Sequence, residues 1–123
     1  MREFLWIFLG GGLGSMARYI VSKLVYTSSH NFPLSTFSVN IIGSLIIGLI
    51  TGLAAKQTSI SHNLLLFAVT GFCGGFTTFS TFALENVSLL REGDYFNFFL
   101  YSIGSIISGL LAVLLGFVIT KAF

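Results

Sequence analysis

Four long runs of apolar residues, separated by short polar segments, dominate the hydrophobic pattern of the chain. We place them at residues 4–26, 33–55, 62–90 and 95–120. Each is long enough for the roughly 20 residues that a helix needs to cross the hydrocarbon core of a bilayer. Charged residues gather mostly between the runs, as in loops that join spanning helices. The pattern predicts an all-α integral membrane protein in which one domain, residues 1–123, contains four transmembrane helices.

Composition places the chain in lipid rather than in water. Its hydrophobic fraction is 54%, its charged fraction is 8% and its mean hydropathy is +0.95, whereas about a quarter of the residues of a soluble domain are charged. The loops at 27–32 and 56–61 leave no room for a soluble domain. Function must therefore reside within the membrane.

The first apolar run has a second interpretation, as a cleavable signal peptide that follows Arg2. The run continues past Gly14 into further apolar residues, however, and no cleavage site of the A-x-A type appears. The single cysteine, Cys73, lies inside a span. It implies no disulfide framework, and a small buried residue is its expected role.

Basic residues are almost evenly divided between the two sides of the membrane. One side carries Arg2, Lys56 and Lys121, and the other carries Lys23 and Arg91, with Arg18 added if its side chain reaches outward. Since an excess of Lys and Arg in cytoplasmic loops sets orientation, this chain has little to orient it. Either it inserts both ways, or one basic residue or a partner fixes a single orientation. If both orientations coexist, the simplest closed assembly is an antiparallel, dual-topology homodimer.

Small and polar residues recur every four positions along the second span, at Asn40, Ser44, Gly48 and Gly52. Gly10 and Gly14 form a similar pair in the first span. Such stripes allow close packing of helices, which is sufficient to explain the glycines. Asn40 differs because an amide inside an apolar span must find partners. It is either a link between helices or part of a polar pathway.

The third span contains the segment GFCGGFTTFSTF, residues 71–82, in which glycines precede hydroxyl and phenyl side chains. Gly74 and Gly75 weaken a helix, and the hydroxyls can bond to freed backbone groups. We predict a break near residues 74–78, close to the middle of the span. It would leave free carbonyls on one side and free amide protons on the other. The alternative is a continuous helix whose hydroxyls bond to preceding carbonyls.

Phenyl side chains in this segment also bear on the sign of the charge that could pass. Phe79 and Phe82 are three residues apart and hence on one helix face, with Ser80 and Thr81 beside them. The edge of an aromatic ring is positive, so rings presented edge-on can line the route of a small anion, although core packing is the usual role of phenylalanine. Hydroxyls, amides and ring edges offer donors without permanent charge, which suits an anion that must bind and also leave.

Three segments resemble, in order and spacing, the signature blocks of the Fluc fluoride channels, also called CrcB proteins: GGGLGSMARY (10–19), VNIIGSLIIG (39–48) and GFCGGFTTFSTF (71–82). The likeness covers almost the whole chain. It implies a dual-topology homodimer in the bacterial inner membrane, whose antiparallel subunits form two pores that pass fluoride passively and export it to reduce its toxicity. It implies no enzyme activity. A heterodimer with a paired paralogue is the alternative assembly.

By the same resemblance, a structural sodium ion lies at the dimer centre, held by main-chain carbonyls of Gly74 and Thr77. The implied ion pathway comprises Asn40, Phe79, Ser80, Thr81 and Phe82, continued by Tyr101 and Ser105 of the fourth span. Arg18 matches the arginine of the family, which makes the vestibule of the pore positive and attracts anions. The residues alone also allow Arg18 to reach the interface or to form a salt bridge with Glu85 of the same subunit.

Other functional classes fit the residues less well. A small proton-coupled multidrug exporter also has four short spans, but it needs a carboxylate deep in the membrane, whereas Glu3 is at an end and Glu85 is off-centre. A membrane scaffold would leave Asn40 without a role. No basic cluster supports binding to nucleic acid. His30 and His62 have no Cys, Asp or Glu nearby at metal-binding or nucleophile spacing.

Overall fold

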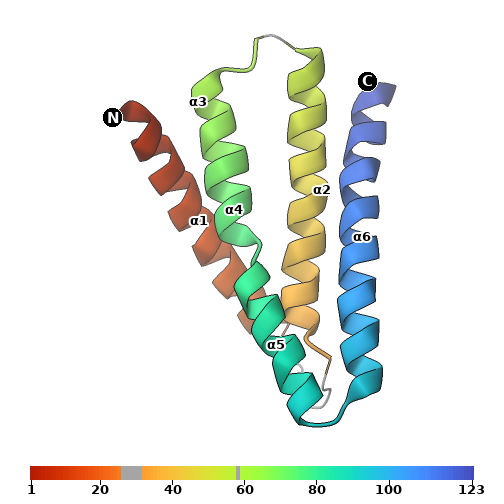
Figure 1. Ribbon diagram of the computed structural model, residues 1–123. Coiled ribbons are helices and arrows are strands. Elements are labelled where there is room, and N and C mark those ends of the chain that lie inside the picture. The colour runs from red at the N-terminus through yellow and green to blue at the C-terminus, as the bar shows by residue number, and fades with distance from the viewer. Residues whose placement is uncertain (26–31, 58) are drawn as a thin grey trace.

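The computed structural model describes residues 1–25, 32–57 and 59–123, and within these it consists of helices and short connections (Figure 1). The elements are α1 (Arg2–Leu24), α2 (Leu34–Lys56), α3 (His62–Leu65), the π-helix η1 (Leu66–Cys73), α4 (Gly74–Phe76), α5 (Phe79–Arg91) and α6 (Tyr95–Ala122). Tyr26, the predicted end of the first span, and His30 lie outside the described residues.

Among the described residues, four segments are long and apolar enough to cross a membrane. Three of them are the single helices α1, α2 and α6, and the fourth, His62–Arg91, joins α3, η1, α4 and α5. The chain is therefore an all-helical, multi-pass membrane protein, as predicted. α1 begins at Arg2 rather than Phe4, and α6 continues to Ala122, because a helix does not need to end where its apolar run ends.

Both termini and the α2–α3 connection lie at one end of the bundle, and the α5–α6 turn lies at the other (Figure 1). Arg2, Lys56 and Lys121 are therefore at one end, and Arg91 is at the opposite end. These four residues therefore lie on the two sides of the membrane to which the sequence assigned them.

Hydrogen bonds and one glycine fix the helix ends next to the loops. The Ser61 side chain caps α3 by accepting from the Leu64 amide, at 3.2 Å. The Asp94 carboxylate caps α6 in the same way, accepting from the Asn97 amide at 3.2 Å. Between α5 and α6, Gly93 has φ 75°, a left-handed conformation that glycine adopts without the steric cost of a Cβ.

α1 packs directly on the first half of the third span through its glycines. A Cβ at Gly10 would overlap the Phe67 carbonyl oxygen, and a Cβ at Gly14 would overlap that of Phe72. The two glycines are four residues apart, whereas the two carbonyls are five apart. The wider turn of η1, with its i→i+5 bonding, lets carbonyls five apart face one side of the helix. This π-helix was not predicted from the sequence.

α2 and α6 lie side by side along most of their length (Figure 1). A Cβ at Gly48 would overlap the Val113 backbone, and one at Gly52 would overlap the Thr120 hydroxyl. Gly116 of α6 is equally close to the backbone of α2. Small residues thus bring the two backbones together, which is the packing role expected for this stripe.

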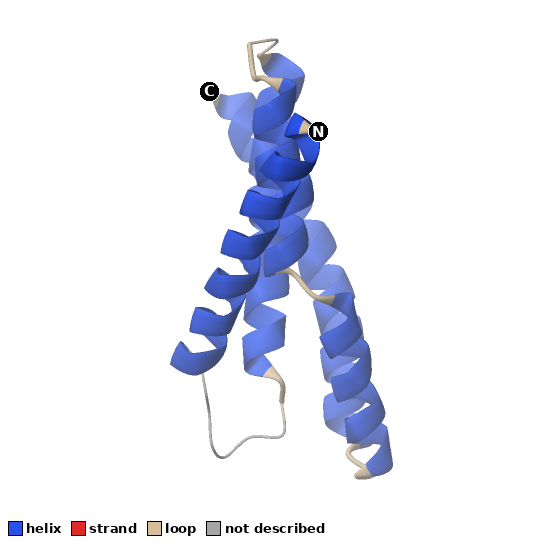
Figure 2. Cartoon of the chain, turned by 90° about the vertical axis from the view of Figure 1, so that its left-hand side faces the viewer, coloured by secondary structure: helices blue, strands red, loops and turns tan. Residues whose placement is uncertain are grey.

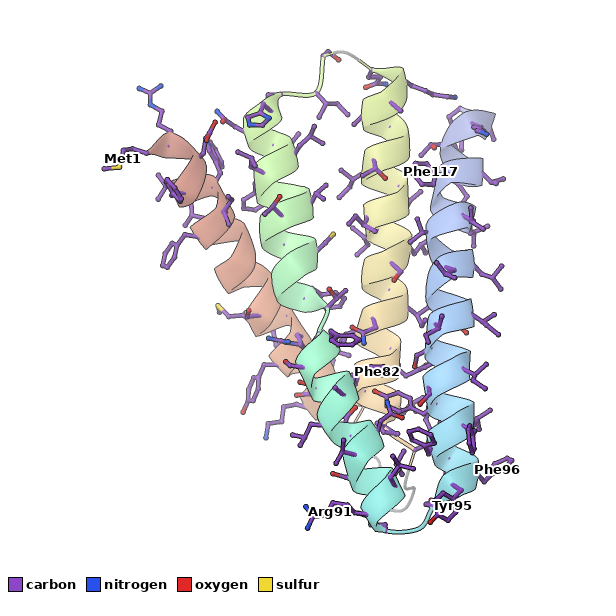
Figure 3. The ribbon with its side chains drawn as sticks, viewed as in Figure 1. Met1, Phe82, Arg91, Tyr95, Phe96 and Phe117 are labelled. Atoms are coloured by element: carbon purple, nitrogen blue, oxygen red, sulfur yellow. The ribbon has the colours of Figure 1, made fainter. Side chains whose placement is uncertain are left out.

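Many large apolar side chains remain exposed on the single chain, among them Phe8, Met16, Ile106, Leu110 and Val118. Such faces contact lipid or another subunit, because lipid tails are as apolar as these side chains. Tyr95 and Phe96 are also exposed, at the start of α6 and at the same end of the bundle as Arg91 (Figure 3). Aromatic residues are enriched at membrane–water interfaces, so these two mark where that end of the bundle meets the membrane surface.

Candidate functional site

The third span is broken near its middle by two extended residues. α4 ends at Phe76 and α5 begins at Phe79, and between them Thr77 has φ −82° and ψ 158° and Thr78 has φ −149° and ψ 119°. Figure 2 shows this connection as a short tan segment at mid-height of the molecule. The predicted break is confirmed, and the continuous helix is excluded.

Asn40 of α2 satisfies the backbone of the break. The Thr78 amide donates to Asn40 Oδ1 at 2.8 Å, and Asn40 Nδ2 donates to the Thr78 carbonyl at 3.1 Å. The Asn40 side chain therefore takes the place of a helical acceptor for the Thr78 amide and adds a donor to the Thr78 carbonyl, at a depth where water is not available to do so. Asn40 is therefore a link between helices, which is one of the two roles predicted for it. It also lines the groove described below.

The same contacts release carbonyl oxygens from the helix. The Thr77 amide still bonds to the Cys73 carbonyl at 3.0 Å. In an α-helix the Thr78 amide would donate to the Gly74 carbonyl, four residues earlier. Here the Thr78 amide donates to Asn40 instead, so the Gly74 carbonyl lacks that donor. Gly74 is also exposed. The Gly74 carbonyl oxygen is a hard, uncharged ligand of the kind that suits a small hard cation, so this residue fits the sodium ion implied by the resemblance.

An open groove of about 450 Å³ runs beside the break. Six of the predicted ion-pathway and sodium-site residues line it: Asn40, Gly74, Thr77, Phe79, Phe82 and Ser105. They come from three of the four spans, and Figure 3 shows Phe82 on the side of α5 that faces α2. Ser80, Thr81, Tyr101 and Arg18 are not among its lining residues.

Two phenyl rings of α5 and one hydroxyl of α6 line this groove. The ring centroids of Phe79 and Phe82 are 5.8 Å apart and their planes are tilted by 41°. Phe79 is 78% exposed, which is far more than a packed core residue would be. Ser105 Oγ is buried and has no hydrogen-bond partner among the described residues. The Ser105 hydroxyl is therefore available to donate a hydrogen bond to a ligand from the α6 wall of the groove.

Ser80 and Thr81 belong to a small hydroxyl cluster around Thr78, at the start of α5. The Thr78 hydroxyl accepts from the Thr81 amide at 3.3 Å and lies 3.0 Å from Thr81 Oγ1 and 3.5 Å from Ser80 Oγ. The cluster caps α5, because Thr78 satisfies one of its free amides. The prediction that hydroxyls near the break bond to freed backbone groups is confirmed at Thr78, whose position before a run of helix-compatible residues is typical of an N-cap.

Glu85 bonds to hydroxyl groups rather than to a cation. The Thr36 hydroxyl donates to Glu85 Oε1 at 2.7 Å, and the Tyr101 hydroxyl donates to Oε2 at 2.6 Å. The expected salt bridge between Arg18 and Glu85 is wrong: in the described residues both carboxylate oxygens are engaged by these two hydroxyls, and no ion pair joins them to Arg18. Tyr101 is fully buried and lies behind Phe82, with ring centroids 5.0 Å apart.

Thr36 is the polar residue that sequence reasoning missed. It lies four residues before Asn40, hence on the same face of α2, and this spacing was a signal that could have found it. Thr36 and Asn40 both reach across to the third span, one to Glu85 and the other to Thr78. α2 therefore supports the third span on both sides of the phenylalanine pair.

Fold and site together define a class: a small multi-pass membrane protein whose third span breaks at a groove lined with uncharged polar groups and phenyl rings. A family model described as CrcB-like protein, Camphor Resistance (CrcB), matches residues 5–117. The chain belongs to the CrcB family.

Several relatives match this chain over nearly their full length, and each is named a fluoride-specific ion channel FluC. The protein of Azobacteroides pseudotrichonymphae is 43% identical over 100% of this chain and 99% of its own. That of Chlorobium luteolum is 48% identical over 91% and 87%, and that of Phocaeicola vulgatus 46% identical over 94% and 96%. The resemblance stated from the sequence is thereby confirmed.

Proposed function

We propose that this protein is a fluoride-selective, passive ion channel of the bacterial inner membrane. The observation that carries the proposal is that relatives 43–48% identical to it are named fluoride-specific ion channels. Their name is that of a channel family and not of an enzyme. The geometry adds physical support, because the groove at the break offers donors without fixed charge.

An anion that loses its water must receive other donors in exchange. Phe79 is the first residue of α5 and lines the groove, so the groove meets a helix N-terminus, where free amides and the helix dipole favour negative charge. The phenyl edges of Phe79 and Phe82, the Ser105 hydroxyl and the polar edge of Asn40 add to these. We propose that Ser80 and Thr81 keep this helix start in place, and that Tyr101 continues the route behind Phe82.

The proposed working unit is a homodimer of inverted subunits with two pores. On one chain, Gly74 and Phe79 are exposed next to the break, yet irregular backbone at membrane depth is tolerated only where protein or a cavity covers it. A second copy would cover it, and the nearly even distribution of basic residues supports insertion in both orientations. Arg18, half-buried near the end of α1, would make the pore vestibule positive.

We propose a structural sodium ion at the dimer centre, held by the Gly74 and Thr77 carbonyls of both copies. The ion would supply fixed positive charge and hold the two breaks together. In each copy, Asn40 accepts the hydrogen bond of the Thr78 amide, which leaves the Gly74 carbonyl available to the ion. Thermal unfolding in sodium and in potassium salts at equal ionic strength tests the ion, and an equal midpoint in both would argue against it.

Direction follows from charge. A cell interior is electrically negative, so a passive anion channel exports its ion. Fluoride that enters as neutral HF in acid surroundings and dissociates inside would leave by this route, which would lower its toxicity. The same field would not drive export through a closed or cation-selective pore.

Fluoride efflux from liposomes under a potential set by potassium and valinomycin tests the function. The purified protein should release fluoride but not chloride, each followed with an ion-selective electrode. Phe79→Ile keeps apolar bulk but removes the ring edge, and should abolish efflux. Phe96→Ile, at an exposed position outside the groove, is the matched control and should not. Chloride efflux as fast as fluoride efflux would remove the selectivity, and no fluoride efflux from folded protein would remove the channel.

Membrane orientation is tested by labelling. Glu92→Cys, in the exposed α5–α6 turn, is combined with Cys73→Ala so that one thiol remains. A membrane-impermeant maleimide should label about half of the protein in intact cells, because inverted copies present this turn on opposite sides. Permeabilised cells should give complete labelling. Complete or absent labelling of intact cells would show a single orientation.

A further inference from the structure

A tight turn at Pro33 places the ring of Phe32 at the start of α2. Pro33 has φ −76° and ψ 69°, and the Leu34 amide donates to the Phe32 carbonyl at 2.8 Å. These values describe an inverse γ-turn. Proline also restricts the residue before it to extended conformations. The backbone therefore fixes the point from which the Phe32 side chain extends, more firmly than in an ordinary loop.

Phe32 contacts Tyr101, the fully buried residue behind the groove. The ring centroids of Phe32 and Tyr101 are 5.4 Å apart and their planes form an angle of 76°. Tyr101 also contacts Phe82, at 5.0 Å and 59°. The contact with Phe32 is edge-to-face and that with Phe82 is tilted, and an edge-to-face contact favours a defined ring orientation. Tyr101 is thus held by one ring from the groove and by one ring from the turn before α2.

The orientation of the Tyr101 ring decides where its hydroxyl lies, because the oxygen is at the tip of a rigid side chain. That hydroxyl donates to Glu85 Oε2 at 2.6 Å. O–H···O hydrogen bonds extend only to about 3.0 Å, so a small tilt of the ring breaks this one. Thr36, the donor to the other oxygen, cannot replace it, since it is already engaged.

We propose that Phe32 is a positioning residue of the ion pathway, which keeps the Tyr101 hydroxyl on Glu85. This inference rests on the proposed fluoride channel. Without the Phe32 ring, Tyr101 tilts away, and Glu85 is left with a free oxygen beside Phe82. That oxygen is an acceptor in a route that must offer donors to an anion, and it repels fluoride. Phe32 does not touch the ion in this account and acts only through Tyr101.

A double-mutant cycle on fluoride efflux from liposomes separates this role from a structural one. Phe32→Ala and Tyr101→Phe should each slow efflux about tenfold, the upper end of what one hydrogen bond contributes. The double variant should be no slower than Tyr101→Phe alone, because the hydroxyl through which Phe32 acts is already gone. Phe32→Leu, which restores most of the volume, should recover much of the rate.

Phe37→Ala is the matched control, since Phe37 packs on Phe32 at 5.6 Å and its loss removes the same volume from the ring cluster without removing the Tyr101 contact. Its efflux should stay close to that of the wild-type protein. The tyrosine vibrational spectrum gives a readout independent of flux: the Tyr101 band, isolated by difference against Tyr101→Phe, should report a weaker hydrogen bond in Phe32→Ala.

Four results would overturn the inference while leaving the channel itself intact: normal efflux through Phe32→Ala, normal efflux through Tyr101→Phe, multiplied losses in the double variant, or an unchanged Tyr101 band. Absence of fluoride efflux from the wild-type protein would instead refute the proposed function. The two failures are therefore distinguishable in one set of vesicles.

Discussion

Replacement of Asn40 by alanine is the perturbation that probes the break most directly. Asn40→Ala removes the acceptor of the Thr78 amide and the donor to the Thr78 carbonyl, two hydrogen bonds of 2.8 and 3.1 Å. Thr78 is 8% exposed, and it lies at the middle of the span, so water cannot take over either bond. The substitution makes α2 slightly more apolar, so α2 remains a membrane span and the loss of the amide is the main effect.

Its magnitude follows from measured hydrogen bonds between membrane helices. These contribute about 0.6 kcal/mol on average and about 1.7 kcal/mol at most. Two such bonds predict that Asn40→Ala lowers the free energy of unfolding by about 1–3 kcal/mol. The Thr78 amide can recover part of this loss by returning to the Gly74 carbonyl, which straightens the span. Fluoride efflux should then fall further than stability does, because the Gly74 carbonyl and the start of α5 would both move.

Equilibrium unfolding by SDS titration in mixed micelles, followed by circular dichroism, measures the free energy. Thr51→Ala is the matched control on the same helix. Its hydroxyl bonds to the Ile47 and Gly48 carbonyls of α2 itself, and such back-bonds stabilise a helix little. We expect Thr51→Ala to change the free energy of unfolding by less than about 0.5 kcal/mol.

Equal stabilities of the Asn40→Ala and Thr51→Ala variants would refute the reasoning, since the link between α2 and the break would then contribute nothing. Full fluoride efflux through Asn40→Ala would contradict the second half of the prediction. A loss of stability above about 5 kcal/mol would also count against it, because two bonds cannot supply that much.

Three further predictions concern single positions. Gly14→Ala places a Cβ against the Phe72 carbonyl and should lower the free energy of unfolding by about 1–3 kcal/mol. Gly12→Ala is its control, since no atom lies within 4 Å of the new Cβ, and it should not lower the free energy of unfolding. SDS titration compares the two variants. Gly93→Ala, at φ 75°, should cost about 1–2 kcal/mol in the same titration, and an unchanged midpoint would contradict the left-handed turn. Ser105→Ala removes a hydroxyl without a partner among the described residues, so it should slow fluoride efflux several-fold with an unchanged unfolding midpoint; an unchanged rate would exclude Ser105 from the pathway.

Much of the architecture was predictable because lipid imposes strong constraints on sequence. Four apolar runs gave the four spans, and the glycines and hydroxyls of residues 71–82 gave the break. The break itself falls at Thr77 and Thr78, after the glycine pair and not on it. Gly74 and Gly75 are helical, and Gly75 packs against the Gly11 backbone. Its small size is used for close packing, while Asn40 of another span holds the chain extended.

Glu85 shows why long-range contacts were not predictable. A carboxylate near the end of a span suggested a pair with Arg18, the nearest intramembrane cation in the predicted topology. The structure gives it Thr36 and Tyr101 instead, which come from residues 49 and 16 positions away in the chain. Periodicity identifies which residues share a face of one helix, but it does not state which faces of different helices meet.

By itself, the sequence determined the solvent, the number of spans, the family likeness and the residue types available for a route without fixed charge, because each follows from composition or local spacing. Only the tertiary structure decided that Asn40 serves the Thr78 backbone, that η1 widens to fit the glycines of α1, and that Phe32 reaches Tyr101. Those contacts depend on how rigid helices pack against one another. Such packing is settled by the mutual fit of surfaces from distant segments, which no single stretch of the chain contains.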